Sequence, residues 1–334
     1  MLITIINPKN NSPLNIVDGK LTDNEGNTFP VINGIPRIAD IENYTDNFGV
    51  QWNKFDTTQL DRERDGLTHS NKRLFAESGW CADDLTSKNI LEVGSGAGRF
   101  SKVVLECTKA NLYSVDYSDA VSANYKNNGQ IAPERFHLFQ ASIYELPFPD
   151  NSFDKVFCFG VLQHTPDFQL SIKALVDKAK PGSEIVVDFY AIKGWWTKIH
   201  AKYILRPITK KLSHKSLMTI IQKNINWMMW LFDVLQLSGF GVLTRFIPIA
   251  DMRLFPKNLT ITERKEWAFL DTFDMFSPEY DNPQRIIDVV KMFEKYGADV
   301  NYYGIIEYDE GSGAVVRAIK KIEINFLHKI SLSV

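Results

Sequence analysis

A glycine-rich turn follows a short apolar run and precedes an amphipathic segment. It reads Glu92-Val93-Gly94-Ser95-Gly96-Ala97-Gly98, with the acidic residue near the end of the apolar run and a glycine at every second position. Glycine has no Cβ atom, so the backbone can turn tightly and approach a ligand closely. The helix N-terminus that follows offers free N–H groups, which suit a carboxylate or a phosphate. The turn indicates a ligand site, and a merely tight strand-to-helix connection is the alternative.

A second acidic residue, Asp116, ends the next apolar run at 112–115. In a nucleotide-binding α/β sheet, a carboxylate at this position accepts hydrogen bonds from both ribose hydroxyls. With Ser118 and Asp119 beside it, Asp116 is equally suited to capping a helix or a turn. The residue alone leaves both roles open.

The spacing of apolar runs predicts the elements that position these residues. Runs that alternate with helical or loop segments are typical of a parallel sheet with helices on both faces. We predict core strands at 89–93, 112–115, 136–139, 155–159 and 184–190. A helix over about 284–296 and strands near 300–307 and 314–320 follow.

The order of these motifs resembles the class I S-adenosylmethionine-dependent methyltransferases, in particular the type 11 group. The segments that carry the resemblance are Glu92 to Gly98, Asp116, Leu146-Pro147-Phe148, Phe153-Asp154-Lys155-Val156 and Val161-Leu162-Gln163-His164. The resemblance covers about residues 86–190, and 283–320 fit the reversed end of the family's sheet. It implies an α/β fold with a Rossmann-like seven-stranded sheet and S-adenosyl-L-methionine as the cofactor.

The resemblance also implies roles for individual residues. Those expected to line the methionine end of the cofactor are Glu92, Gly94, Ser95, Gly96 and Gly98. Asp116 is expected to hold the ribose, with Tyr117 beside the adenine. Where the family usually has an aspartate that bonds the adenine amino group, this chain has Ser142. A neutral hydroxyl gives a weaker bond, so the backbone N–H of Ile143 is a second candidate for adenine recognition.

Methyl transfer from a sulfonium is an in-line displacement, so the protein mainly aligns the two reactants in a dry pocket. If the acceptor is a hydroxyl, a general base helps. His164 follows the fourth strand, at the carboxyl edge where ligands bind, and is the candidate catalytic residue. The alternative is that His164 bonds the backbone or packs near the cofactor.

The end of the fourth strand bears on the acceptor. Residues 160–163 read Gly-Val-Leu-Gln, in place of the Asn-Pro-Pro-Tyr that accompanies transfer to amide or base nitrogens. We therefore predict O-methylation of a small molecule, a sugar or a lipid-linked glycan, with no nucleic acid as partner.

Residues 1–40 contain short apolar runs separated by turn signals, which predict a small β module. Its segment 29–36 resembles the end of the Trm112-like zinc ribbon found ahead of some bacterial methyltransferases. The cysteine pairs of that module would fall near Asn7, Asn10, Thr22 and Glu25, which cannot supply thiolates to zinc. We expect a degenerate module without metal, followed by a helical lead-in over 41–85.

Residues 191–270 interrupt the predicted core of 86–190 and 271–320, and are too many for a plain loop. This insertion has no acidic residue between Asp188 and Asp233, but it has eight basic ones: Lys193, Lys198, Lys202, Arg206, Lys210, Lys211, Lys215 and Lys223. We predict a basic helical lid over the acceptor site. The charge run is open to three interpretations, namely a solvated helix face, an anionic acceptor site and peripheral contact with an anionic membrane.

Composition excludes several classes of protein. The 334 residues are 44% hydrophobic and 23% charged, which fits a globular chain with a large core and not a disordered one. A net charge of -2 gives no global field of the kind that marks nucleic-acid binders. Three scattered cysteines argue against a disulfide framework and favour a reducing, cytoplasmic location.

Two other functions compete with methyl transfer. An NAD-linked oxidoreductase would carry G-x-G-x-x-G/A, but here the third glycine comes one position early. A non-catalytic scaffold with the same fold is suggested by the missing zinc ligands and by Ser142. The intact acidic and glycine positions of the turn, and Asp116, count against that scaffold.

Overall fold

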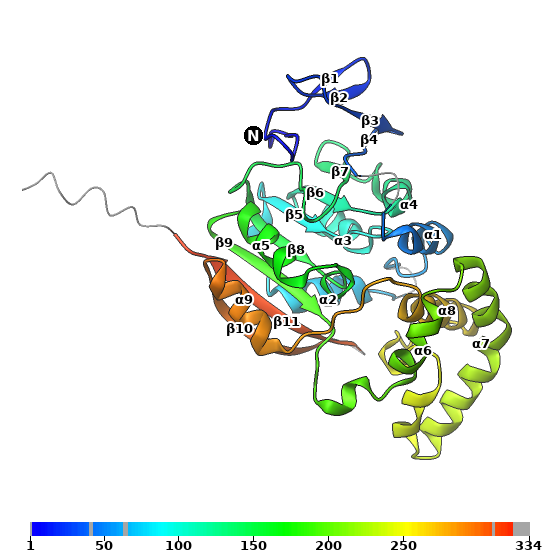
Figure 1. Cartoon of the computed structure of the whole chain (residues 1–334). Helices are drawn as coiled ribbons and strands as arrows, with labels where there is room; N and C mark the ends of the chain where they lie inside the picture. The colour runs from blue at the N-terminus through cyan, green and yellow to red at the C-terminus, as the bar shows by residue number, and fades with distance from the viewer. Residues whose placement is uncertain (1, 40–42, 63–65, 309–310, 323–334) are drawn as a thin grey trace, which may run out of the picture.

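The computed structural model describes residues 2–39, 43–62, 66–308 and 311–322, and its centre is a seven-stranded sheet (Figure 1). The strand order is β10-β11-β9-β8-β5-β6-β7. Strands β5 to β9 are parallel, whereas β11 runs antiparallel to both β9 and β10. The bounds are β5 Asn89–Val93, β6 Asn111–Asp116, β7 Phe136–Gln140, β8 Phe153–Cys158, β9 Ala179–Phe189, β10 Ala298–Tyr308 and β11 Gly311–Lys320. The predicted Rossmann-like sheet with a reversed final strand is confirmed.

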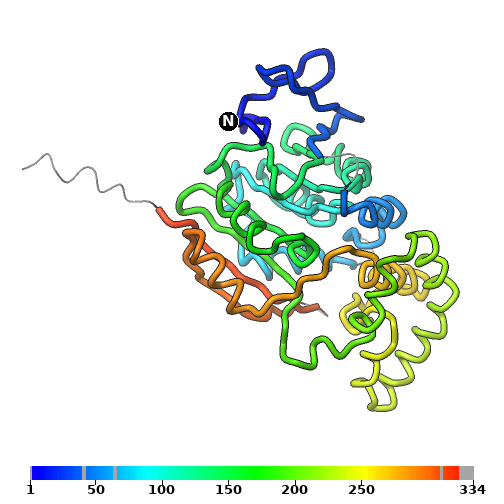
Figure 2. Tube along the Cα trace, in the orientation of Figure 1, coloured from blue at the N-terminus to red at the C-terminus, as the bar shows by residue number. Residues whose placement is uncertain are grey.

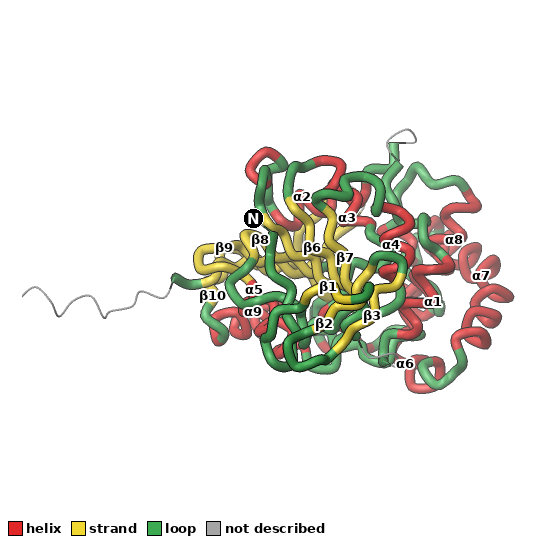
Figure 3. The backbone as a smooth tube through the Cα atoms, turned by 90° about the horizontal axis from the view of Figure 1, so that it is seen from above, coloured by secondary structure: helices red, strands yellow, loops and turns green. Residues whose placement is uncertain are grey.

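Helices cover both faces of this sheet, as the view from above also shows (Figure 3). One face packs against α2 (His69–Ser78), α3 (Arg99–Cys107) and α4 (Ala120–Asn128), and the other against α5 (Phe168–Lys178) and α9 (Ile286–Lys295). Because successive strand residues point to opposite faces, Ile90 and Leu91 belong to different clusters of the core. A strand covered on both sides needs a continuous apolar run, which is what the sequence has at 89–93.

The N-terminal module is a four-stranded antiparallel sheet, as predicted. Its strands are β1 (Asn15–Val17), β2 (Lys20–Thr22), β3 (Thr28–Ile32) and β4 (Ile35–Pro36). Figure 2 shows it at one end of the molecule, beside the β7 edge of the large sheet. The backbone N–H of Ile38 donates to the carbonyl oxygen of Gln140 at 2.7 Å, and Arg37 pairs with Asp119 at 2.8 Å.

A buried carboxylate lies at the centre of this module. Asp23 is only 5% exposed, and its Oδ2 accepts hydrogen bonds from the side-chain amides of Asn7 (2.7 Å), Asn10 (2.9 Å) and Asn27 (2.8 Å). Its Oδ1 accepts the backbone N–H groups of Glu25 and Asn27. These donors, above all Asn27, hold the pKa of Asp23 well below its usual range. Hydrogen bonds to this one carboxylate connect the loops of the module. The described residues contain no cluster of metal-ligating side chains.

We expect Asp23→Ala to lower the melting temperature by several degrees, because the buried amide donors lose their acceptor. The contribution of Asp23 to stability is present above its unfolded pKa and is lost as pH falls through the lower folded value. Thermal unfolding followed by circular dichroism measures both effects. Glu25→Ala, which removes an exposed side chain of the same loop, is the control. A fall in the wild-type melting temperature on adding a chelator would contradict this account.

Between β9 and α9 the chain builds a separate helical layer, lying away from the N-terminal module (Figure 2). It contains α6 (Ala201–Thr209), α7 (His214–Leu237), α8 (Ile261–Phe276) and 3₁₀ turns at Trp195–Lys198, Gly241–Phe246 and Met252–Leu254. Met228 and Phe232 of α7 share a core cluster with Phe269 and Phe273 of α8. Within the described residues, no helix has the length and apolar character needed to cross a membrane.

The predicted boundary of the insertion at 270 falls inside α8, so the insertion extends at least to Phe276. The sequence Asp271-Thr272-Phe273-Asp274 mixes acidic and apolar residues. In the helix, Phe273 packs into the core of the insertion while Asp271 and Asp274 face a cavity. The mixture is the two-sided pattern of one helix.

Candidate functional site

A cavity of about 620 Å³ opens at the carboxyl ends of the parallel strands, between the sheet, the insertion and α1 (Asp46–Lys54). The carboxyl ends of parallel strands meet at one edge of the sheet, and ligands of open α/β sheets bind there. Seven predicted site residues line the cavity: Gly94, Ser95, Gly96, Asp116, Tyr117, Ile143 and His164. Three others, Glu92, Gly98 and Ser142, are not among the described lining residues.

Glu92 lies beneath the glycine-rich turn and not in the cavity wall. Its Oε2 accepts the hydroxyls of Ser101 (2.5 Å) and Ser114 (2.8 Å), and Ser101 in turn accepts the side-chain amide of Asn124. Burial raises the pKa of Glu92 to about 7, although the two serine hydroxyls oppose this. In this arrangement Glu92 positions the turn through hydrogen bonds to the neighbouring helix and strand.

Two glycines of the turn are needed for close packing. Gly94 and Gly98 both have positive φ values, 83° and 86°. A Cβ atom on Gly94 would meet Val161 at 2.1 Å, and one on Gly98 would meet Asn124 at 2.1 Å. A larger residue at either position would be disfavoured both by the positive φ value and by a steric clash.

Asp116 performs the turn role that its sequence context allows and also lines the cavity. Its Oδ1 accepts the backbone N–H and the hydroxyl of Ser118, and its Oδ2 accepts the backbone N–H of Gly96 at 2.8 Å. Burial raises the pKa of Asp116, and these donors oppose the shift. A carboxylate oxygen can accept more than one hydrogen bond, so acceptor capacity is left for ligand hydroxyls. Ser142 instead accepts the backbone N–H of Tyr144.

Helix α1 covers the half of the cavity next to the glycine-rich turn, which the sequence analysis did not anticipate. Gln51 and Trp52 line this half, and Phe48 of the same helix lines the cavity beside His164. The indole of Trp52 lies so close to Gly96 that a Cβ atom there would be 3.2 Å from the ring. Asn53 anchors the helix by donating to the carbonyl oxygen of Asp119 at 3.1 Å. The sequence feature that could have predicted this role is the spacing of residues 48, 51 and 52, which places all three on one face of a helix.

Two buried polar atoms in this half indicate which chemical groups of a ligand it could bind. The hydroxyl of Ser95 and the Oε1 of Gln51 are buried and have no hydrogen-bond partner among the described residues. Burying polar groups without partners is costly, so such atoms are expected to face a ligand. A hydroxyl can donate to a carboxylate, and an amide oxygen can accept from an ammonium group. Together with Asp116 they fit a ligand that carries an amino-acid end and a ribose.

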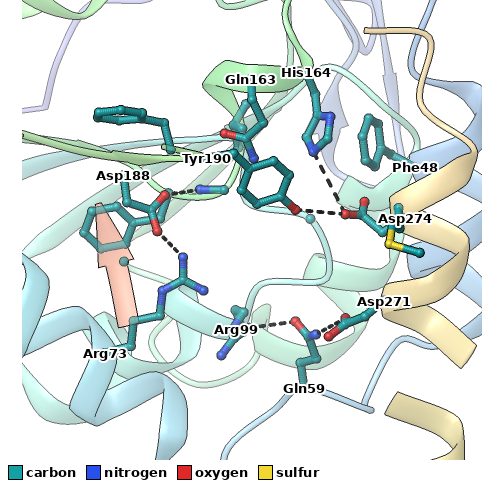
Figure 4. Close-up of a pocket in the computed structure, with 18 of the residues that line it drawn as sticks. Phe48, Gln59, Arg73, Arg99, Gln163, His164, Asp188, Tyr190, Asp271 and Asp274 are labelled. Atoms are coloured by element: carbon teal, nitrogen blue, oxygen red, sulfur yellow. Dashed lines mark hydrogen bonds and ion pairs between the residues drawn. The ribbon is translucent and has the colours of Figure 1, made fainter. Parts of the chain in front are cut away.

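His164 lies in the other half of the cavity, among Phe48, Tyr190 and Asp274 (Figure 4). It is 5% exposed, and its Nδ1 lies 3.1 Å from the carbonyl oxygen of Tyr280. A carbonyl oxygen only accepts, so Nδ1 carries the proton and Nε2 presents a lone pair. Burial lowers the pKa of His164, which favours this neutral form.

The Nε2 atom of His164 has no hydrogen-bond partner in the described part of the chain. The Oδ2 of Asp274 lies 3.9 Å away and receives the hydroxyl of Tyr190 at 3.4 Å. A carboxylate at this distance favours a positive charge on the imidazole when a proton arrives. The sequence analysis identified His164 but not the carboxylate beside it, because Asp274 comes from the insertion, 110 positions further along the chain.

A chain of hydrogen-bonded polar side chains also lines this half of the cavity (Figure 4). Arg99 donates to Gln59 at 2.6 Å, and Gln59 donates to Asp271 at 3.0 Å. Burial, with the charge of Asp274, raises the pKa of Asp271 to about 7, and burial lowers that of Arg99 to about 10. Gln163 is fully buried, and neither atom of its amide has a partner within the described residues. This half therefore offers several donors and acceptors to a polar ligand.

Two of the basic residues of the insertion make contacts that hold its first helix in place. Lys202 is buried and pairs with Asp281 at 2.8 Å, and Arg206 donates to the carbonyl oxygen of Pro278 at 2.8 Å. Burial lowers the pKa of Lys202, and Asp281 opposes this. These contacts fasten α6 to the segment that leads into α9, so the two cations are not part of a solvated face. Lys202 also lines the cavity.

Comparison with known proteins identifies the core. Residues 91–187 match the family model described as a methyltransferase domain. A tRNA U34 carboxymethyltransferase of Nautilia profundicola is 28% identical over 111 residues, 33% of this chain and 37% of that protein. A ubiquinone/menaquinone biosynthesis C-methyltransferase of Vibrio cholerae is 27% identical over 134 residues, 39% of this chain and 48% of that protein. The chain thus covers less than half the length of these two curated relatives.

Among solved structures, a complex of the Haloferax volcanii Trm112 methyltransferase activator with a methyltransferase aligns at a TM-score of 0.47. The identity is 11%, and the alignment covers 83% of this chain and 99% of that one. A score at this level does not establish a shared fold, so the assignment rests on the domain match, the strand order and the site. The core of this chain is a class I methyltransferase domain whose cofactor is S-adenosylmethionine.

Proposed function

We propose that the protein transfers a methyl group from S-adenosylmethionine to a hydroxyl of a small molecule, a sugar or a lipid-linked glycan. The observation that carries the proposal is the state of His164: a buried, neutral imidazole whose Nε2 faces the cavity with its lone pair free among the described residues. That is the form a general base must have to take a proton from a hydroxyl. An acceptor already deprotonated, or a carbon nucleophile, would not need it in the same way.

The cofactor supplies an electrophilic methyl group on a positively charged sulfur. Ser95 and Gln51 would hold its amino-acid end, and Asp116 would hold its ribose. While the methyl group is transferred, Nε2 of His164 would accept the proton of the acceptor hydroxyl. The bond from Nδ1–H to Tyr280 fixes the ring, and Asp274 at 3.9 Å stabilises the resulting imidazolium. Phe48 and Tyr190 pack on the imidazole and keep water away.

The acceptor half of the cavity supports a ligand rich in hydroxyl groups. Gln163 offers an amide donor and an amide acceptor, and the Nη2 of Arg99 is a further buried donor without a partner in the described residues. The two relatives are named for a tRNA and for quinone biosynthesis, yet each matches at most 39% of this chain. Acceptors that differ over a shared core are chosen by residues outside it, which here means α1 and the insertion.

Calorimetric titration with S-adenosylhomocysteine, using NAD as the control ligand, tests the cofactor. We expect micromolar binding of the first and none of the second. Binding of NAD would favour the oxidoreductase, and binding of neither would favour the non-catalytic scaffold. Incubation with S-adenosylmethionine and pools of hydroxylated acceptors, followed by mass spectrometry, then tests the acceptor class. A product methylated on nitrogen or carbon would contradict O-methylation.

A further inference from the structure

Helix α7 is apolar on two faces. Leu217, Ile221, Ile225, Met228 and Phe232 pack into the core of the insertion. On the outer face the exposed apolar side chains follow one another at intervals of three, four or seven residues: Ile220, Trp227, Trp230, Val234 and Leu237. Trp230 is 65% exposed and Leu237 is 89% exposed. A helix of a globular protein normally has one apolar stripe, which faces the core, so the outer stripe calls for a partner.

The exposed apolar surface continues beyond the end of α7. The 3₁₀ turns at 195–198 and 241–246, with the residue before the second turn, expose Trp195, Trp196, Phe240, Val242, Leu243 and Phe246. Arg245 joins the two turns by donating to the carbonyl oxygen of Trp196 at 2.5 Å. Figure 1 shows both the C-terminal end of α7 and the turn before α6 at the end of the insertion away from the N-terminal module. We call this surface, together with the stripe of α7, the outer face of the insertion.

The exposed charged residues of the segment 189–232 are all positive. Six lysines of the insertion are exposed: Lys193, Lys198, Lys210, Lys211, Lys215 and Lys223. The sequence has no acidic residue from 189 to 232. The next one, Asp233, forms a two-point ion pair with Arg264 at 2.6 and 2.8 Å. The outer face therefore combines apolar and tryptophan side chains with an uncompensated positive charge.

We propose that the outer face docks on the surface of an anionic lipid bilayer. Tryptophan has an apolar body and a polar N–H group and favours the boundary between lipid and water. Lysines beside an apolar helix face attract anionic headgroups. A second copy of the same face would instead place like charges against each other, which disfavours self-association.

Docking on a membrane would also affect which acceptor reaches the cavity. This second step rests on the proposed function, but the docking itself does not. Lys193, Thr197 and Leu254 line the cavity, and Thr197 belongs to the same turn as Trp195 and Trp196. An outer face seated on lipid therefore brings that part of the cavity wall to the membrane surface. Among the acceptors proposed above, this favours a hydroxylated group anchored in the lipid.

Co-sedimentation of the full chain with vesicles tests the docking. We expect sedimentation with equimolar phosphatidylcholine and phosphatidylglycerol, much less with phosphatidylcholine alone, and weaker binding at high salt. The double variant Trp230→Ser/Leu237→Ser should lower the partition coefficient by at least about tenfold. Ile16→Ser, which removes a 75% exposed apolar side chain from the N-terminal module, should change nothing. Both substituted positions of the double variant are exposed, and thermal unfolding checks that it folds.

Three outcomes would overturn the proposal. The wild-type chain sediments with neither vesicle, the double variant sediments as well as the wild type, or light scattering shows a dimer that the double variant dissociates. The last would assign the outer face to a second copy. Titration of the double variant with S-adenosylhomocysteine keeps the questions separate, because loss of lipid binding with retained cofactor binding concerns the outer face alone.

Discussion

Asp116→Ala is expected to weaken binding of S-adenosylhomocysteine by about 100-fold or more, because hydrogen bonds from ribose hydroxyls to a charged acceptor are each worth about 1.5–3 kcal/mol. The substitution also frees the backbone N–H of Gly96, which Asp116 now accepts at 2.8 Å. Calorimetric titration of the variant measures the loss. Asp150→Ala is the matched control, since it removes an exposed carboxylate that pairs with Lys178 outside the described cavity wall.

Retained tight binding in Asp116→Ala would refute the ribose assignment and leave Asp116 with its turn role alone. Thermal unfolding separates the two roles. If Asp116 serves only the turn, the variant will have a lower melting temperature but will bind S-adenosylhomocysteine with unchanged affinity. A variant that has lost the ligand contact would bind poorly at temperatures far below its melting temperature.

His164→Asn is expected to lower kcat by about 100- to 10,000-fold with an hydroxyl acceptor, which is the usual contribution of a general base. An asparagine amide can still donate to the carbonyl oxygen of Tyr280, so the local fold should be kept. The affinity for S-adenosylhomocysteine should change little. If His164 only packs beside the cofactor, the variant will instead show weaker cofactor binding or a lower melting temperature with kcat nearly unchanged.

The same residue predicts a pH profile. Burial lowers the pKa of His164 below its usual 6.5, so the basic form is already dominant at neutral pH. We expect kcat to be level above about pH 6.5 and to fall only in more acid solution, where Nε2 is protonated. The contribution of His164 to folding stability also decreases as pH falls, because the histidine binds a proton at a higher pH in the unfolded chain than in the folded one. A kcat that rises on acidification would contradict the base role.

The sequence predicted the placement of the residues whose positions depend on local order. The turn at 94–98 and Asp116 belong to consecutive elements, and the alternation of strand and helix brings them to one edge of the sheet. It could not predict that Glu92 lies under the turn, because that depends on Ser101 and Ser114, from a helix and a strand, donating to its carboxyl group, and on Asn124 of a third element donating to Ser101. The hydrogen-bond partners of a buried strand residue depend on which elements pack against its side of the sheet, and the local sequence does not show this.

The acceptor half was hard to predict for a related reason. Asp271 and Asp274 face the cavity from α8, whereas Phe273 between them packs into the core of the insertion. The sequence left the role of Lys202 and Arg206 open, because their partners, Asp281 and the carbonyl oxygen of Pro278, come more than 70 positions later. Composition shows that charges are present, but only contacts across the fold show which of them are paired.

The carboxylate at the centre of the N-terminal module changes what that module needs in order to fold. A zinc ribbon must acquire its ion, and its thiolates can be oxidised or stripped of metal. Residues 1–40 contain no cysteine, and Asp23 with its three asparagines does the organising through bonds that need no ion. We therefore expect the module to assemble without zinc, so that zinc scarcity or thiol oxidation would leave this end of the molecule intact.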